Sequence, residues 1–432
     1  MLVPDLSVPR VARYTWARQW RAELCAGAVE GILGVGSFTA MRSLGAPDWI
    51  AALFVSFGPI LWLAAPAWEA AFARFHFRQA FLWMGLAANA PMLLVALVDD
   101  DALAQGWGLW LFTGVIVIAA AVDAAYVPHR GALASANYPL AVRGRIFATL
   151  STVSRFSTIV AAKTSGWLLD ADFRWIRVLF PIAGVCGLLE HWALSRIRWQ
   201  RAGVPKVRAW SGIGTATAAA RDAWRDATRV LRDDRGFRVY EIGFLLYGFG
   251  FLMSNPLVTI YAVHDLKLSY GEWTTASGLA QQVAYVATIL TFGRAVDRFG
   301  VVRTTAAAFA LLTLFFTTMP FVRDAVTLDA CYLLFGVAMA LVNLGWTLGP
   351  LEFAPTGEAR TYTTVHVLFV GLRSAIAPFL GWWLSTRIGI AAVFSISAVL
   401  VAAGCATMVW LRRSRRAAQR SSSAPSNASP GA

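Results

Sequence analysis

The chain has 432 residues, of which 58% are apolar and only 14% carry a charged side chain. A water-soluble domain carries roughly 25% charged residues, so this composition excludes a soluble protein and indicates a surface covered mainly by lipid. The formal net charge of +14 does not indicate a nucleic-acid partner, because the basic residues fall in gaps between apolar segments, where they suit anionic lipid headgroups.

Stretches of about 20 apolar residues are long enough to cross the ~30 Å core of a bilayer as α-helices. We expect helices throughout, because an open strand edge leaves backbone groups without hydrogen-bond partners in lipid. The sequence therefore predicts an all-α polytopic membrane protein. In chain order, the twelve predicted transmembrane helices are residues 22–44, 47–67, 79–98, 105–126, 146–169, 174–195, 239–262, 271–293, 304–322, 325–349, 361–384 and 387–410.

Lysine and arginine are distributed unevenly among the gaps between these helices. Most of the 38 basic residues lie in the two ends of the chain and in the gaps that fall on the same side as those ends. Because loops rich in lysine and arginine stay in the cytoplasm, we expect both termini to be cytoplasmic. The setting that we expect is the inner (plasma) membrane of a bacterium.

The longest gap, residues 196–238, divides the chain into two halves of six predicted helices each. We expect a first bundle at residues 1–195, a second at 239–410, and a disordered cytoplasmic tail at 411–432, where serine and other small residues dominate. Within the gap, Trp224, Ala227 and Leu231 share one face of a predicted helix. This helix either lies on the inner leaflet or is an ordinary solvated linker.

The two halves repeat sequence features at fixed spacings. A tryptophan opens the predicted helices 47–67 and 271–293, and an Arg-Phe pair follows 25 residues later in each. The predicted helices 146–169 and 361–384 are each directly preceded by an arginine, and a glycine follows that arginine by 21 residues in both. Two coincident spacings indicate internal duplication, which is common in transporters.

The gap after residue 293 reads Gly293-Arg-Ala-Val-Asp297-Arg298-Phe-Gly300-Val-Val-Arg303. It resembles the G-x-x-x-D-R-x-G-[RK]-[RK] loop of the major facilitator superfamily, although valines replace two basic positions, and the resemblance covers nearly the whole chain. The two glycines permit a tight turn, and the aspartate can cap a neighbouring helix or pair with an arginine. In that family the loop latches the two halves on the cytoplasmic side.

The copy of this loop in the first half has lost its glycine and aspartate but keeps a basic rim that includes Arg74. We expect Asp123, near the end of the helix 105–126, to complete the cytoplasmic gate with Arg143 and Arg145. The helix 146–169 lacks the G-P-x-x-G-G run associated with antiporters of the family. That departure weighs against drug efflux.

Three charged side chains, Glu30, Arg155 and Arg373, fall deep inside predicted helices, where charge is costly unless it faces a cavity or a partner. Glu30 and Arg155 lie roughly 12 and 14 Å from the same side, at 1.5 Å per residue, and Arg373 corresponds by repeat symmetry to Thr158. Three interpretations stay open. The two arginines clamp an organic anion, Glu30 titrates against Arg155 to couple transport to protons, or a static ion pair fixes the helix packing.

Further polar side chains lie at intermediate depths. Lys163, two turns beyond Arg155, either adds positive charge to the site or extends to the outer headgroups. The neutral candidates either contact a solute or hold helices together, and they are Asn255, Gln281, Gln282, Asn343 and Trp346.

The sequence contains no phosphate-binding glycine loop and no nucleophilic or metal-ligating constellation, so we expect neither an enzyme nor a cofactor. We expect a monomeric secondary transporter that moves a small solute, an organic anion being one candidate, by alternating access coupled to a proton gradient. Two alternatives stay open: efflux of drugs or metabolites by proton antiport, and a scaffold or sensor that keeps the fold without transporting.

Overall fold

The computed structural model describes residues 10–64, 77–138, 140–197, 213–355 and 358–423, and within these ranges the regular structure is helical, with no strand. The helices of the first half are α1 (Arg10–Leu33), α2 (Gly36–Arg42), α3 (Trp49–Leu61), α5 (Phe77–Asn89), α6 (Asp100–Ala104), α7 (Trp107–Asn137), α8 (Leu140–Ala171) and α9 (Ile176–Ser195). Short 3₁₀ segments continue α3 (η1, Trp62–Ala64) and α5 (η2, Ala90–Leu97).

The linker helix is α10 (Ile213–Asp233), and the second half follows it. Its helices are α11 (Arg235–His264), α12 (Tyr270–Thr274), α13 (Gln281–Phe299), α14 (Val301–Thr318), α15 (Ala325–Phe353), α16 (Ala359–Ile388) and α17 (Ile390–Ser423). A π-helical segment, η4 (Thr275–Ala280), joins α12 to α13.

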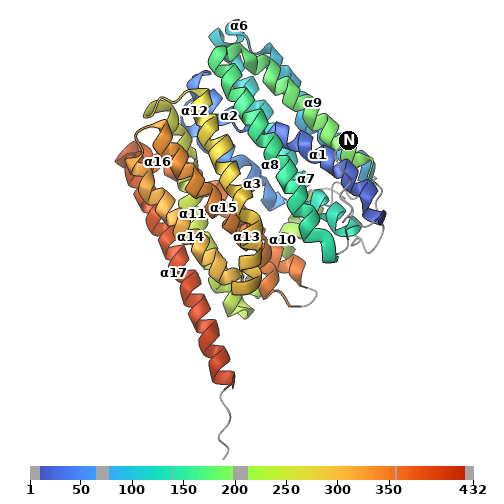
Figure 1. Ribbon diagram of the computed structural model, residues 1–432, viewed down its shortest axis with the longest axis vertical. Helices are drawn as coiled ribbons and strands as arrows, with labels where there is room; N and C mark the ends of the chain where they lie inside the picture. Colours follow the sequence, from blue (N-terminus) through green and yellow to red (C-terminus); the bar gives the residue numbers. More distant parts are fainter. Residues whose placement is uncertain (1–9, 65–76, 139, 198–212, 356–357, 424–432) are drawn as a thin grey trace, which may run out of the picture.

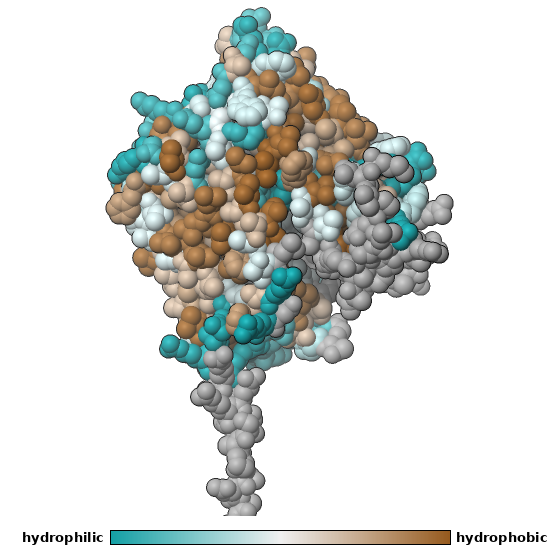
Figure 2. Space-filling view, viewed as in Figure 1, coloured by the Kyte–Doolittle hydropathy of each residue, from teal (hydrophilic) through white to brown (hydrophobic). Residues whose placement is uncertain are grey.

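In the described part of the chain, nine helices are long and apolar enough to cross a membrane, and the shorter apolar helix Trp49–Ala64 runs beside them. The predicted helices 146–169 and 271–293 correspond to α8 and to the continuous α12, η4 and α13. Figure 2 shows apolar side chains across the middle of one face and hydrophilic side chains gathered toward its two ends. The predicted all-α polytopic membrane fold is confirmed.

The first half and the second half form two bundles that lie side by side (Figure 1). In the first, α1 packs on α8 and α9, and in the second, α11 packs on α16 and α17. The bundles meet where α3 contacts α16 and where α12 contacts α8. We call the end of the molecule with α6 and α12 the distal end, and α10 and the end of α17 lie at the opposite end (Figure 1).

Two glycines on α1 allow close packing against α8. A Cβ atom on Gly27 would lie 2.8 Å from the Cβ of Ser157 and nearer still to the carbonyl oxygen of Ser154, and one on Gly31 would lie 2.6 Å from the carbonyl oxygen of Thr158. Small residues four positions apart let two helix backbones touch. This contact sets the distance between the charged residues of α1 and those of α8.

We expect Gly27→Val to lower the stability of the protein by about 1–3 kcal/mol, because the added atoms force α1 away from α8. The matched control is Gly114→Val in the middle of α7, where an added Cβ would meet no atom within 4 Å. Thermal unfolding in detergent measures both variants. Equal loss of stability in the two would contradict close helix packing at Gly27.

The last helix differs from the prediction in where it ends, and the linker helix in what its apolar face covers. The last helix continues to Ser423 rather than ending at residue 410. The alanine, arginine and glutamine residues after position 410 favour helix, and no proline follows within α17, since the next one along the chain is Pro425. The linker helix α10 buries Ala227 and Val230 and leaves Trp224 44% exposed. It packs on α11 and α16, so its alanine and valine side chains cover protein, and Trp224 lies on another face.

Candidate functional site

The Glu30 carboxylate on α1 and the Arg155 guanidinium on α8 form an ion pair between Oε1 and Nη1. The hydroxyl of Thr158, one turn along α8, donates to the other carboxylate oxygen of Glu30 at 3.5 Å. The side chains of Glu30 and Arg155 remain 46% and 29% exposed. Solvent therefore reaches both partners of a pair that the close packing of α1 and α8 holds together.

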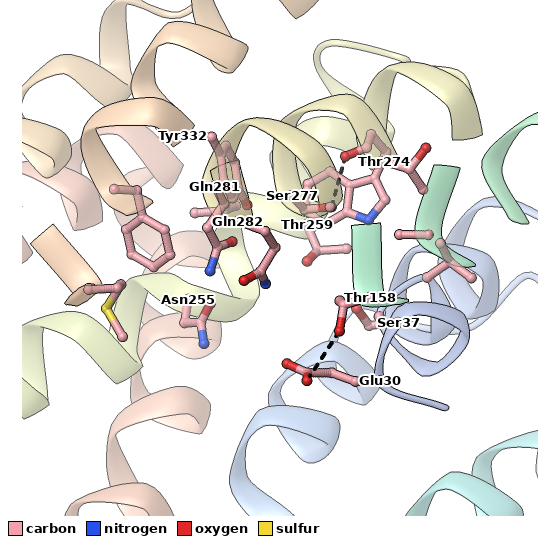
Figure 3. Close-up of a pocket in the computed structure, with 18 of the residues that line it drawn as sticks. Glu30, Ser37, Thr158, Asn255, Thr259, Thr274, Ser277, Gln281, Gln282 and Tyr332 are labelled. Carbon is pink, nitrogen blue, oxygen red and sulfur yellow. Dashed lines mark hydrogen bonds between the residues drawn. The ribbon is translucent and has the colours of Figure 1, made fainter. Parts of the chain in front are cut away.

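Glu30 lies at the boundary of two cavities. The central cavity, of about 350 Å³, lies between the two halves, with Glu30 and Thr158 on one side and Asn255, Gln281 and Gln282 on the other (Figure 3). The first-half cavity, of about 820 Å³, is lined by residues of α1, α5, η2, α7, α8 and α9. Its charged and titratable lining residues are Glu23, Glu30, Asp123, Arg155, Glu190 and His191.

A tyrosine links this ion pair to the second half. The Arg155 guanidinium lies 5.6 Å from the centre of the Tyr285 ring on α13. The side-chain amide of Asn343 on α15 donates to the Tyr285 hydroxyl at 2.6 Å. Asn343 thus contacts another helix of its own half, while Tyr285 brings α13 against the arginine of the first half.

Arg373 lies elsewhere, inside the second bundle. It is 5% exposed, donates from Nη1 to the carbonyl oxygen of Phe244, and lies 5.6 Å from the centre of the Tyr247 ring. It lines neither the central nor the first-half cavity. The structure therefore brings Arg155 to Glu30 and places Arg373 against the backbone of α11.

Arg373 lacks a carboxylate partner because of the residue that faces it on α11. Alignment of Glu23 with Glu241 places Gly248 where the first half has Glu30. A Cβ atom on Gly248 would overlap the guanidinium of Arg373. The second half thus offers this arginine space and a backbone carbonyl where the first half offers a carboxylate.

A second pair, which unlike the first is fully buried, was not predicted from the sequence. Nδ1 of His366 on α16 and Oε1 of Glu241 on α11 lie 2.8 Å apart, and the two side chains are 1% and 3% exposed. Trp346 packs against His366 with ring centres 5.6 Å apart, and it lines neither cavity. The available signal was the spacing of seven residues from His366 to Arg373, which places both on one face of a helix.

Lys163 joins the two halves near the distal end. Its ammonium group donates to the Gly271 carbonyl at 3.0 Å and to the Thr275 hydroxyl at 2.6 Å. Asp170, two turns along α8, accepts the backbone N–H groups of Tyr270 at 2.7 Å and Gly271 at 2.6 Å. These contacts tie α8 directly to α12.

Other residues close the distal end alongside this contact. The Phe38 ring stacks on Trp273 at 5.1 Å, and His264 lies 2.9 Å from the carboxylate of Asp48. Each pair joins one residue of the first half to one of the second. The two bundles are therefore in contact at the distal end through polar and aromatic side chains.

At the opposite end, Gly300 connects α13 to α14 with a φ of 81°, a conformation that glycine adopts without steric cost. Gly293 lies inside α13, so Gly300 alone makes the turn. Arg298 and Arg303 lie over the ring of Phe299 at 5.2 and 4.5 Å. The side chains of Asp297, Arg143 and Arg145, and all of Arg74, lie outside the part of the structure that is described.

Glu352, at the end of α15, makes the contacts that were expected of Asp297. Its carboxylate accepts the backbone N–H of Val301 at 3.2 Å, at the start of α14. It also pairs with Arg415 of α17 at 2.7 Å. A carboxylate at a helix N-terminus is stabilised by the helix dipole, so Glu352 ties together three helices of the second half.

Comparison with known proteins identifies the fold family. The model of the Major Facilitator Superfamily matches residues 22–367 and 241–430. None of the curated protein sequences matches the chain.

Three solved structures illustrate the likeness. A POT family transporter in complex with a thioalcohol-conjugated peptide is 14% identical, with a TM-score of 0.72, over 95% of this chain and 99% of that one. The nucleoside transporter NupG is 12% identical, with a TM-score of 0.62, over 94% of this chain and 100% of that one. The human organic anion transporter MFSD10 (TETRAN) is 15% identical, with a TM-score of 0.64, over 93% and 100%. At these identities the structures support the fold, and the family match, which spans nearly the whole sequence, shows that the chain belongs to the Major Facilitator Superfamily of membrane transporters.

Proposed function

We propose that this transporter moves a small solute by alternating access and couples that movement to protons through Glu30 and Arg155. The observation that carries the proposal is an ion pair with solvent access at the boundary of the two cavities. A buried structural pair has little contact with water, whereas a coupling group must exchange protons with it. The cavity between the halves is the place where alternating access exposes a solute to each side in turn.

The charge balance explains how protonation would act. With Glu30 ionised, the pair with Arg155 is neutral overall. A proton on Glu30 leaves the arginine without its counter-ion, and an uncompensated charge inside a membrane protein is costly. The protein then favours the arrangement that solvates Arg155 differently or gives it another partner, so proton binding biases the equilibrium between the two orientations.

The anion clamp receives less support than the coupling role. Arg373, which was expected to form half of the clamp, lines neither cavity, and Arg155 is already paired with Glu30. A clamp needs two guanidinium groups directed at one site. We therefore assign the ion pair to coupling and leave the recognition of the solute to other residues.

We place the protein, as a monomer, in a bacterial inner membrane with both termini in the cytoplasm, following the distribution of basic residues. The distal end, where Lys163 and Asp170 of α8 contact α12, then faces away from the cytoplasm. We infer that the contacts between the halves at that end close the central cavity toward the outside. Opening of the distal end is the other half of the cycle.

Uptake into proteoliposomes tests this function. With a pH gradient of one unit, we expect at least one probe from a panel of succinate, glucose, uracil and an amphipathic cation to accumulate, and a protonophore to abolish the accumulation. The gradient supplies about 1.4 kcal/mol per proton, which corresponds to an accumulation of roughly tenfold for one proton per solute. A folded protein that moves none of these probes above the level of empty liposomes would favour a scaffold.

A further inference from the structure

Three primary amides of the second half lie in the central cavity without a hydrogen-bond partner among the described residues. The side chains of Asn255 on α11 and of Gln281 and Gln282 on α13 line the same space (Figure 3). In the part of the chain that the structure describes, none of the three forms a side-chain hydrogen bond, and Gln282 is only 7% exposed. Each amide therefore presents a donor and an acceptor to whatever fills the cavity.

Two other amides of the chain have protein partners. Asn343 donates to Tyr285 on another helix at 2.6 Å, and Asn89 donates to the carbonyl of Gly85 in its own helix at 3.0 Å. Gln282 is buried, whereas Asn255 and Gln281 are partly exposed. A polar group without a protein partner keeps its hydrogen bonds only with water or with a solute. The position of Asn255, Gln281 and Gln282 thus indicates a binding surface.

The cavity selects against charge. Of the described residues that line it, Glu30 alone carries a charged group, and that carboxylate is paired with Arg155. A solute with a net charge would find no free counter-ion among the lining residues. The solute that fits best is uncharged and forms hydrogen bonds with neutral amides.

Aromatic rings form part of the wall of the central cavity. Phe251 and Phe335 line the cavity with their rings nearly parallel, 12° apart, at 6.2 Å, and Trp273 meets Tyr332 edge to face at 6.1 Å. Planar rings stack favourably on such side chains, with about 1–3 kcal/mol per base in nucleic-acid complexes. The amide of asparagine or glutamine matches an adjacent donor and acceptor on the edge of a ring.

We propose that the central cavity binds an uncharged, planar heteroaromatic ring whose edge carries cyclic amide groups, the chemistry of a nucleobase. The inference rests on the proposed transport function and names its solute class. The ring would stack on the aromatic wall and present its edge to Asn255, Gln281 and Gln282. A volume of about 350 Å³ lies at the small end of the range of roughly 300–1,000 Å³ for small-molecule sites.

Binding to the purified full-length protein in detergent tests the class without requiring transport. The probes are radiolabelled uracil, uridine, glucose and succinate, measured by scintillation proximity. We expect uracil to bind, and Gln282→Met and Asn255→Leu, which remove an amide at similar volume, each to weaken binding roughly tenfold or more. Gln105→Met, at the exposed end of α6, is the matched control, and thermal unfolding verifies that each variant is folded.

The four probes distinguish between a free base, a base with its sugar, a sugar and an organic anion as the bound solute. Binding of uracil without uridine identifies a free base as the solute, and binding of both identifies a base with its sugar. Glucose or succinate binding in place of both would overturn the proposal, as would uracil binding that neither amide variant weakens. The coupling proposal fails separately, if uracil binds but a pH gradient does not drive its uptake.

Discussion

Glu30→Gln is expected to abolish proton-driven accumulation of solute in proteoliposomes while leaving the exchange of solute across the membrane intact. Glutamine has the size of glutamate and its carbonyl oxygen can still accept a hydrogen bond from Arg155 and Thr158, but it binds no proton in the physiological range. A one-unit gradient worth about 1.4 kcal/mol per proton then has no effect. The accumulation ratio falls from roughly tenfold to one.

The experiment compares gradient-driven uptake with counterflow, in which unlabelled solute inside the liposome drives entry of labelled solute. Asp100→Asn is the matched control, because Asp100 forms an exposed ion pair with Arg174 at 2.6 Å and lines neither cavity. If the Glu30–Arg155 pair only fixes packing, Glu30→Gln combined with Arg155→Gln restores stability and gradient-driven uptake together. That restoration, or normal accumulation in Glu30→Gln alone, would contradict coupling through this pair.

The pairing of Glu30 with Arg155 was predictable because both residues lie at matched depths from one side of the membrane. Helix geometry converts sequence position into depth, and a charge in lipid demands a partner. The glycines Gly27 and Gly31, which bring α1 against α8, make the contact possible. Matched depth and the cost of an unpaired charge predicted this contact as one of three interpretations, beside an anion clamp formed by Arg155 and Arg373.

The position of Arg373 shows where repeat symmetry stops being informative. Duplication preserves the helix on which a residue lies, but the contacts of its side chain depend on the opposing helix. Gly248 replaces the carboxylate that faces Arg155 in the first half, so the symmetric arginine packs against the carbonyl of Phe244. The alignment of the two halves predicts the helix on which a residue lies, whereas the residues of the facing helix determine what its side chain contacts.

Contacts that use the backbone leave little trace in a sequence. Lys163 binds the carbonyl of Gly271, which any residue at that position would supply. The sequence also did not distinguish Asn343, whose side chain bonds to the side chain of Tyr285, from Asn255, which forms no side-chain hydrogen bond with the described residues. The difference is a matter of which helix lies opposite, and only the packed structure provides it.

A disulfide between Asp170→Cys on α8 and Gly271→Cys on α12 is expected to stop transport almost completely, and reduction to restore it. Asp170 accepts the backbone N–H of Gly271 at 2.6 Å, and a Cβ on Gly271 would lie 2.8 Å from the Asp170 carboxylate. The two side chains are therefore within the reach of a disulfide, whose Cβ atoms are about 3.5–4.5 Å apart. The bond joins the two halves at the distal end, which must open in every cycle of alternating access.

The matched controls are the single variants Asp170→Cys and Gly271→Cys, each treated with the same oxidant. A lone cysteine has no partner across the halves, so oxidation should leave transport unchanged. All variants are placed in a background without the native cysteines Cys25, Cys186, Cys331 and Cys405, and the reduced form of each variant sets its own baseline. The crosslink blocks transport only if α8 and α12 must separate when the distal end opens. If the fully oxidised Asp170→Cys/Gly271→Cys variant transports as fast as its reduced form, the halves do not separate at the distal end.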